Sequence, residues 1–222
     1  MRSVNWDRFQ ALLLSATAET LYMVSLAALL TVALGLPVGV LLFLTRKNGL
    51  LPNRAVALLL NALVNTGRAL PFVVLLIALI PFTRLLVGTT LGSTAAIVPI
   101  TIGAFPFFAR IVENALDEVD RGRIEAVESM GGTLWHIVSR VLLPEALPAM
   151  VAGITLTIVM LIGFSAMAGV VGGGGLGDLA IRYGYQRFDN QIMAATIIVL
   201  LLLVLLVQKT GDRLVRSLAC RR

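Results

Sequence analysis

Charged residues are scarce in this chain of 222 residues, and apolar residues dominate it. Only 14% of the residues are charged and 58% are hydrophobic, with a mean hydropathy of +0.94. A soluble domain normally carries about a quarter charged residues. The deficit excludes an ordinary soluble domain and indicates an integral membrane protein. The single cysteine, Cys220, cannot form an intrachain disulfide, so we assign its thiol no role.

Two features of self-powered transporters are missing. The chain has no G-x-x-x-x-G-K-[ST] loop, so it cannot hydrolyse nucleotide in that way. Residues 172–177 match G-x-G-x-x-G, but they follow an apolar stretch and no strand, so we predict no nucleotide site there. None of the twelve carboxylates lies in the middle of a long apolar stretch, where ion-driven transporters usually bind the coupling ion. Backbone carbonyls can replace a carboxylate in sodium sites, so a secondary transporter is disfavoured and not excluded.

Long uncharged stretches predict five membrane-spanning helices. A helix crosses the ~30 Å hydrocarbon core with about 20 apolar residues, and a spanning segment must satisfy its backbone hydrogen bonds internally. The stretches are residues 20–45, 55–83 (interrupted by Arg68), 85–109, 146–177 and 190–208. The fourth is too long for one span, so we assign its helix to residues 148–170 and a glycine-rich loop to the rest. The first is long enough to span, so we expect it to stay in the mature protein.

Basic residues are unevenly divided between the two sides that these spans define. One side collects twelve lysines and arginines and the other five, with Arg68 unassigned. Cytoplasmic loops carry the excess of basic residues, so we expect the C-terminus and the loop at residues 113–145 to be cytoplasmic and the N-terminus to lie outside. The net charge of +6 is then explained by the orientation of the protein in the membrane, and we predict no nucleic-acid partner.

Small residues and prolines mark points of contact or interruption along the spans. Gly35 with Gly39, and Gly169 with Gly173, have the GxxxG spacing that lets membrane helices approach closely. We expect four prolines to kink or interrupt their helices, which helix bundles tolerate: Pro37, Pro71, Pro99 and Pro106.

The predicted cytoplasmic loop mixes charges with apolar residues at helical spacing. Gly131-Gly132 separates two short helices, and Thr133 can cap the second of them. Pro144 and Pro148 are expected to interrupt the helix where the chain returns to the membrane. Two interpretations stay open from this pattern alone. The helices dock into a groove of another protein through their apolar face (Ile124, Val127, Met130, Leu134, Ile137 and Val141), or they rest on the bilayer surface.

Residues in this loop resemble the EAA loop of ABC importer permeases. The family pattern is E-A-A, three residues, G, nine residues, then I-x-L-P, and the spacing matches throughout, with Val127 and Val141 as departures. In that family the loop forms coupling helices that dock on a separate ATPase subunit. The resemblance implies that Gly131 allows a close turn and Pro144 directs the chain into the fourth span. The implied docking loop comprises Glu125, Ala126, Val127, Met130, Gly131, Gly132, Val141, Leu143 and Pro144.

Residues from about 17 to 216 resemble the methionine ABC transporter permeases in particular. The segments that carry this resemblance are residues 35–46, 68–76, 80–84, 96–116 and 163–188. It implies a homodimer in a bacterial cytoplasmic membrane, two ATPase chains that bind ATP and magnesium, a substrate-binding protein, and import of L- and D-methionine. This chain would bind no cofactor or metal and would have no catalytic residue.

The expected architecture is therefore an all-α integral membrane protein of five transmembrane helices, with the coupling-helix loop between spans three and four. Residues 1–16 form an extracytoplasmic segment, residues 17–208 the permease domain, and residues 209–222 a basic cytoplasmic tail.

Three residues of the spans are candidates for the translocation pathway. By resemblance to the family we place an external gate near Met167, with simple helix packing as the alternative. Ser165 lies beside it, and we expect its hydroxyl to bond its own helix. Arg68 is the charge embedded in a predicted span, and it either serves transport or caps a helix interrupted at Pro71. His136 has no second metal-ligating residue near it in the loop.

Three other functions are alternatives to methionine import. One is a permease of the same fold for another small solute, such as a different amino acid or a phosphonate. The others are a stand-alone secondary transporter and a non-transporting membrane scaffold. The absence of membrane carboxylates and the spacing of the loop motif disfavour the secondary transporter, and a scaffold would not require Gly131.

Overall fold

The computed structural model describes residues 6–219, with side chains for residues 9–218. Within that part of the chain all regular structure is helical, which confirms the predicted all-α class. Cys220, residues 1–5 and the last two arginines lie outside the described residues. The helices are α1 (Trp6–Thr45), α2 (Arg54–Ala69), α3 (Phe72–Ala78), α4 (Ile80–Val87), α5 (Ser93–Asp117), α6 (Arg121–Ser129), α7 (Leu134–His136), the π-helix η1 (Ile137–Leu142), α8 (Leu143–Gly169), α9 (Gly175–Leu179), the π-helix η2 (Ala180–Tyr185) and α10 (Asn190–Ala219).

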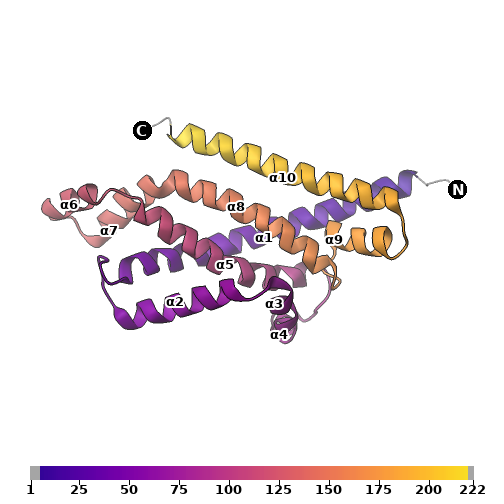
Figure 1. The fold of residues 1–222 in the computed structure, drawn as a ribbon, viewed down its shortest axis with the longest axis horizontal. Helices are drawn as coiled ribbons and strands as arrows, with labels where there is room; N and C mark the ends of the chain where they lie inside the picture. Colours follow the sequence, from indigo (N-terminus) through magenta and orange to yellow (C-terminus); the bar gives the residue numbers. More distant parts are fainter. Residues whose placement is uncertain (1–5, 220–222) are drawn as a thin grey trace.

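Four helical stretches are long and apolar enough to cross a membrane: Phe9–Thr45, Ser93–Asp117, Leu134–Gly169 and Asn190–Leu218. Helices α2 and α3 pass the same test together as one bent span, with 106° between them. The five predicted spans are therefore present when the bent pair counts as one. The long helices run along a common direction, with α6 and α7 at one end of the bundle and α9, α3 and α4 at the other (Figure 1).

The second and third spans differ from the sequence prediction. The second is broken at Pro71, which has no backbone N–H to donate and does not continue α2. The third was placed at residues 85–109, and this was wrong, because α4 ends at Val87 and α5 begins only at Ser93. Gly88 and Gly92, with φ of 83° and 93°, form the turn between them. Arg110 is consequently inside α5 and not in the loop that follows it.

Three of the four prolines expected to kink or interrupt helices lie inside continuous helices, and so do both predicted domain boundaries. Pro37 lies within α1, and Pro99 and Pro106 lie within α5, so the expected interruption is found only at Pro71. The boundary after residue 16 falls inside α1, and the boundary after residue 208 falls inside α10.

The most extensive helix contact joins α1 to α5 and depends on two glycines. A Cβ atom on Gly35 would lie 2.9 Å from Cδ1 of Phe108, and one on Gly39 would lie 2.5 Å from the carbonyl oxygen of Ala109. The predicted packing role of this GxxxG pair is confirmed. Gly169 also permits a close approach, but its neighbour is the backbone of Gly177 at the start of α9.

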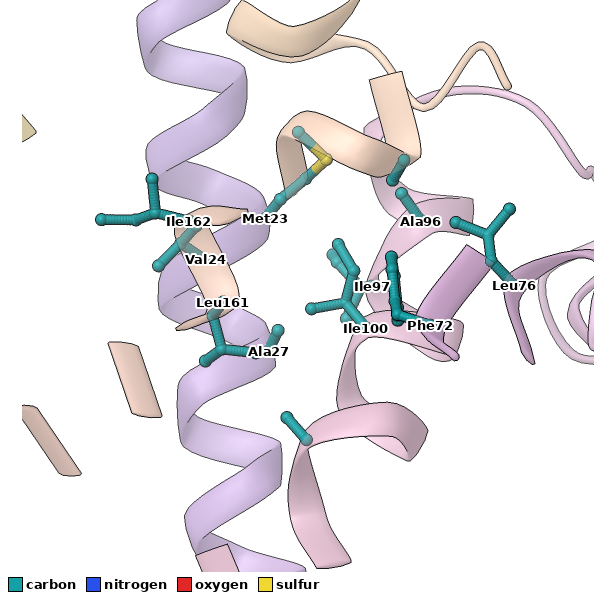
Figure 2. Close-up of a cluster of buried hydrophobic side chains, with 12 residues drawn as sticks. Met23, Val24, Ala27, Phe72, Leu76, Ala96, Ile97, Ile100, Leu161 and Ile162 are labelled. Carbon is teal, nitrogen blue, oxygen red and sulfur yellow. The ribbon is translucent and has the colours of Figure 1, made fainter. Parts of the chain in front are cut away.

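Two clusters of buried apolar side chains lie at opposite ends of this contact. The first contains Met23, Val24 and Ala27 of α1, which meet residues of α3, α5 and α8 (Figure 2). Beside it the rings of Phe72 and Phe164 stack with centroids 3.9 Å apart, which holds the broken second span against α8. The second cluster lies at the α6 end and is formed by Phe43, Leu44, Phe108, Val112, Ala115, Leu116, Val119, Ile124, Ile137, Leu142, Ala146 and Met150.

Gly39→Ala should destabilise the protein, because the new methyl group would overlap the Ala109 carbonyl in a contact that has no room for it. Overpacking of this kind costs about 1–3 kcal/mol. Thermal unfolding of the purified protein in detergent measures the loss. Gly163→Ala is the matched control, since nothing lies within 4 Å of its new Cβ and alanine favours the helix. Equal unfolding temperatures for the two variants would contradict the assigned role of Gly39.

Candidate functional site

The loop between α5 and α8 contains two capped helical segments. The Asp120 carboxylate accepts a hydrogen bond from the Gly122 backbone at 2.9 Å and so caps α6. Thr133 caps α7 as predicted, and it forms a capping box with His136, whose Nδ1 lies 2.8 Å from the threonine hydroxyl. His136 thus has a structural partner in the loop. No group of three or more potential metal ligands gathers anywhere in the described part of the chain.

Gly131 and Gly132 form the tight turn between these segments. The Gly131 N–H donates to Glu128 at 2.9 Å, and the Gly132 N–H donates to Val127 at 2.8 Å. Gly131 has φ of 75°, in the left-handed region that disfavours other residues. A Cβ on Gly132 would collide with Val127, whereas one on Gly131 would meet no atom within 4 Å. The turn therefore needs glycine at 131 for its backbone, while the space outside that glycine is free.

The apolar face of the loop points mainly into the chain's own core. Ile124 and Ile137 are buried in the second core cluster, with Val127, Leu134 and Val141 packed around them. The prediction that this whole face serves as the external anchor was wrong, because these residues attach the loop to the bundle. Leu143 also packs on this cluster, while Pro144 is exposed.

The outer surface of the loop consists of different residues. Glu125, Ala126 and Gly131 are exposed there, and Met130 is 78% exposed. Trp135 was not predicted from the sequence to lie on this surface, and its side chain is 74% exposed. A large aromatic side chain next to a helix cap was the available signal, since exposed tryptophan is enriched at interface hot spots. We define the docking face as Glu125, Ala126, Met130, Gly131 and Trp135.

The loop continues into α8 without a break. Pro144 and Pro148 were expected to punctuate this return, but the helix is unbroken from Leu134 to Gly169. A π-helical turn, Ile137–Leu142, precedes Pro144 directly. The wider turn accommodates a proline that cannot donate an N–H and whose ring crowds the preceding turn. Trp135 of the docking face therefore lies on the same continuous helix as the fourth span.

One ion pair joins the loop to a span, and a second joins the ends of two spans beside it. Arg123 of α6 pairs with Glu145 at the start of α8. Arg46 at the end of α1 pairs with Asp117 at the end of α5, with 2.6 Å between Nη1 and Oδ1. The Arg46 guanidinium also lies over the Phe43 ring, 4.4 Å from its centroid. The first pair joins α6 to α8, and the second joins the ends of α1 and α5.

The opposite end of the molecule contains the glycine-rich turn. The predicted loop is confirmed for residues 171–174, whereas Gly175–Leu179 forms α9, so the loop prediction was wrong for Gly175 to Gly177. Gly174 and Gly175 have φ of 78° and 73°. Asp178 and Arg182 follow as an ion pair, 2.6 Å apart, and the Asp178 carboxylate raises the pKa of Arg182.

Two α1 side chains hold the start of α9. Glu19 Oε2 accepts the Gly175 N–H at 2.7 Å, and Thr20 Oγ1 accepts the Leu176 N–H at 2.8 Å. A Cβ on Gly174 would lie 2.6 Å from the Glu19 oxygen, and one on Gly175 would lie 2.6 Å from the Thr20 oxygen. The glycines are thus needed to bring this backbone onto α1. We call this contact the Glu19–Thr20 cap, and its residues were missed because nothing in the local sequence links them to a turn 156 positions away.

A cavity of about 500 Å³ opens beside the Glu19–Thr20 cap. Charged side chains of Glu19, Asp178 and Arg182 line it together with Ser93 and Tyr183. The cavity therefore presents charges of both signs, and it lies at the end of the bundle opposite the docking face (Figure 1).

The three candidate pathway residues do not form one cluster. Ser165 is 1% exposed and its hydroxyl donates to the Ile162 carbonyl at 2.8 Å, as expected for a serine that bonds its own helix. Met167 is 40% exposed near the end of α8. Arg68 is exposed in the last turn of α2, directly before the break.

Known proteins similar to this chain are transport permeases. Residues 35–219 match the family described as the binding-protein-dependent transport system inner membrane component. The probable D-methionine transport system permease protein MetI of Vibrio cholerae is 56% identical over 205 residues, which cover 92% of this chain and 91% of that protein. The methionine import system permease protein MetP of Bacillus subtilis is 46% identical over 198 residues, 89% of each chain. A chain of the inward-facing MetNI methionine ABC transporter superposes with a TM-score of 0.92 at 47% identity, covering 94% of this chain and 97% of that one.

Thr20→Val should loosen the start of α9, because the buried Leu176 N–H would lose its acceptor. An unsatisfied buried donor costs about 1–3 kcal/mol, so the Leu176 amide should exchange with solvent about tenfold faster or more. Hydrogen exchange followed by mass spectrometry measures this. Thr17→Val is the control, since the Thr17 hydroxyl bonds only the Leu13 carbonyl of its own helix. Unchanged exchange at Leu176 in the Thr20 variant would show that the cap does not hold α9.

Proposed function

The chain belongs to the family of binding-protein-dependent transport system inner membrane components, and we propose that it is the permease subunit that carries methionine through an ATP-driven importer. The observation that carries this proposal is near full-length similarity to methionine permeases, at 56% identity and, for the solved transporter, a TM-score of 0.92. The chain is a translocation subunit and not an enzyme. It works with a second copy of itself, two ATPase subunits and a substrate-binding protein.

The protein is a multi-pass component of the inner membrane. We propose that the docking face and the end of α10 are cytoplasmic and that α1 begins outside. The excess of basic residues on one side of the spans supports this orientation. The loop of α6 and α7 and the end of α10 also lie toward the same end of the bundle (Figure 1).

We propose that the docking face binds the ATPase subunit. Its exposed Met130 and Trp135 offer apolar anchors, and Glu125 offers a charge at their edge. The unoccupied space outside Gly131 would allow the partner's surface to approach the backbone. The remaining residues of the predicted loop, Val127, Gly132, Val141, Leu143 and Pro144, would act by shaping this face rather than by contact. ATP and magnesium would be bound by the ATPase, with no cofactor on this chain.

Transport would proceed by alternating access. Closure of the two ATPase chains on ATP would move α6, and the ion pair of Arg123 with Glu145 would pass this movement to the fourth span. The spans would then open outward to receive methionine, and hydrolysis would restore the inward-facing state. Met167 would form part of the external gate, because it is half-exposed near the end of α8 that carries the glycine turn.

Methionine uptake into proteoliposomes tests the function directly. The vesicles hold this chain with its ATPase, and the binding protein is supplied outside, with and without ATP inside. ATP-dependent accumulation that unlabelled methionine competes away is the expected result. ATP-dependent uptake of a different solute would overturn the substrate, and uptake without the ATPase would overturn the importer assignment.

Replacement of Gly131 by Phe should remove ATPase binding and uptake while the protein remains inserted. The side chain would project from the docking face into the space that the partner needs. Two quantities are measured for each variant: the amount of ATPase that co-purifies with it, and methionine uptake. Gly88→Phe is the control, because Gly88 has a similar φ of 83° and equally open surroundings at the other end of the bundle, so both variants carry the same backbone strain of about 1–2 kcal/mol. Normal co-purification with Gly131→Phe would refute docking at this turn.

A further inference from the structure

One face of α2 carries four polar side chains and one leucine. Arg54, Leu58, Asn61, Asn65 and Arg68 follow at intervals of three or four residues, so they lie on the same side. Asn65 and Arg68 are exposed, and Asn61 is half-buried. The rest of the helix is mostly apolar, which makes two amides and an arginine on one face of a membrane segment unusual.

Helix α5 contributes a charged pair to this face. Arg110 Nη1 lies 2.5 Å from Glu113 Oε2, and Arg110 Nη2 lies 3.0 Å from Asn61 Oδ1 and 2.9 Å from Asn65 Oδ1. The Arg110 and Glu113 side chains are 21% and 15% exposed. Asn61 is seven residues from the start of α2, and Arg110 is seven from the end of α5, so the group sits ~10 Å inside both helix ends.

A cavity of about 630 Å³ extends from the α6 end of the molecule to Asn61, the member of this group that lines it. It is lined by Thr45, Lys47, Pro52, Asn53, Arg54, Ala57, Leu58 and Asn61. Small-molecule sites typically measure ~300–1,000 Å³ and combine apolar walls with a few polar groups. No acidic residue is among those that line the cavity, so its charge is positive and attracts carboxylates.

We propose that Asn61, Asn65, Arg110 and Glu113 bind the α-carboxylate and α-ammonium groups of the transported amino acid on its way toward the α6 end. This inference rests on the proposed function. The carboxylate would take the place of the Asn65 oxygen at the Arg110 guanidinium and accept a hydrogen bond from the side-chain N–H of Asn65, and the ammonium group would bind Glu113. Every charge stays paired during this exchange, so no unpaired charge is left inside the membrane. The side chain of the amino acid would lie along Ala57 and Leu58.

The alternative role for the same residues is a permanent staple between α2 and α5. Exchanging the two charged residues distinguishes the binding role from the staple role. Arg110→Glu combined with Glu113→Arg keeps the ion pair and lets the asparagine amides turn round, but it reverses the positions that carboxylate and ammonium groups need. ATP-driven methionine uptake, ATP hydrolysis and thermal unfolding are measured on the assembled transporter for the wild type, both single variants and the exchanged pair.

The exchanged pair should recover the unfolding temperature and the ATP hydrolysis that the single variants lose. Its methionine uptake should stay at least about tenfold below that of the wild type. This is the effect expected from the loss of one charge-assisted hydrogen bond. Recovery of uptake together with stability would overturn the proposal in favour of a staple. Asn65→Ala gives a second test that leaves the ion pair in place. It should lower uptake per ATP hydrolysed, while Thr66→Ala, an exposed neighbour on another face of α2, should not.

Equal uptake in the Asn65 and Thr66 variants would also overturn the proposal. All of these comparisons require ATP-dependent methionine uptake by the wild type. Its absence would refute the proposed function instead, so the two failures are distinguishable.

Discussion

The close contact between α1 and α5 positions the rest of the structure. Gly35 and Gly39 let the backbone of α1 approach α5 so closely that a single methyl group at Gly39 would overlap a carbonyl oxygen. Van der Waals packing must drive such contacts in lipid, where burial of apolar surface between helices brings little gain. The pair of helices then serves as the frame on which α8 and the broken second span are mounted, through the two core clusters at its ends.

A second constraint is that every break in a membrane helix frees backbone groups that need partners. The start of α9 is satisfied by Glu19 and Thr20 of a distant helix, and the start of α2 by Asn53, whose side chain accepts from Ala55 and Val56. In the turn from α4 to α5, where no side chain caps the start of α5, Gly88 and Gly92 supply the geometry with positive φ. Irregular backbone at these depths is tolerated because protein groups replace water.

The loop of α6 and α7 illustrates how one short segment serves two purposes. Its buried isoleucines attach it to the core of its own chain, and its exposed side chains are left for a partner. A segment attached in this way moves with the spans and not independently of them. The unbroken helix from Leu134 to Gly169 and the ion pair of Arg123 with Glu145 extend this connection to the far end of the fourth span. The proposed docking face is thus connected to the fourth span through local structure.

Composition, charge and spacing in the sequence were sufficient for the membrane class, the number of spans, the turn at Gly131 and the cap at Thr133. These features depend on local chemistry: the length of apolar runs, the conformational freedom of glycine and the hydrogen bonds of a threonine with residues three positions away. The start of α5 at Ser93, the inward face of Ile124 and Ile137, the Glu19–Thr20 cap and the group around Arg110 were decided only by the tertiary structure. Each depends on contacts between segments far apart in the chain, and hydropathy does not encode which partner a polar or apolar side chain will meet.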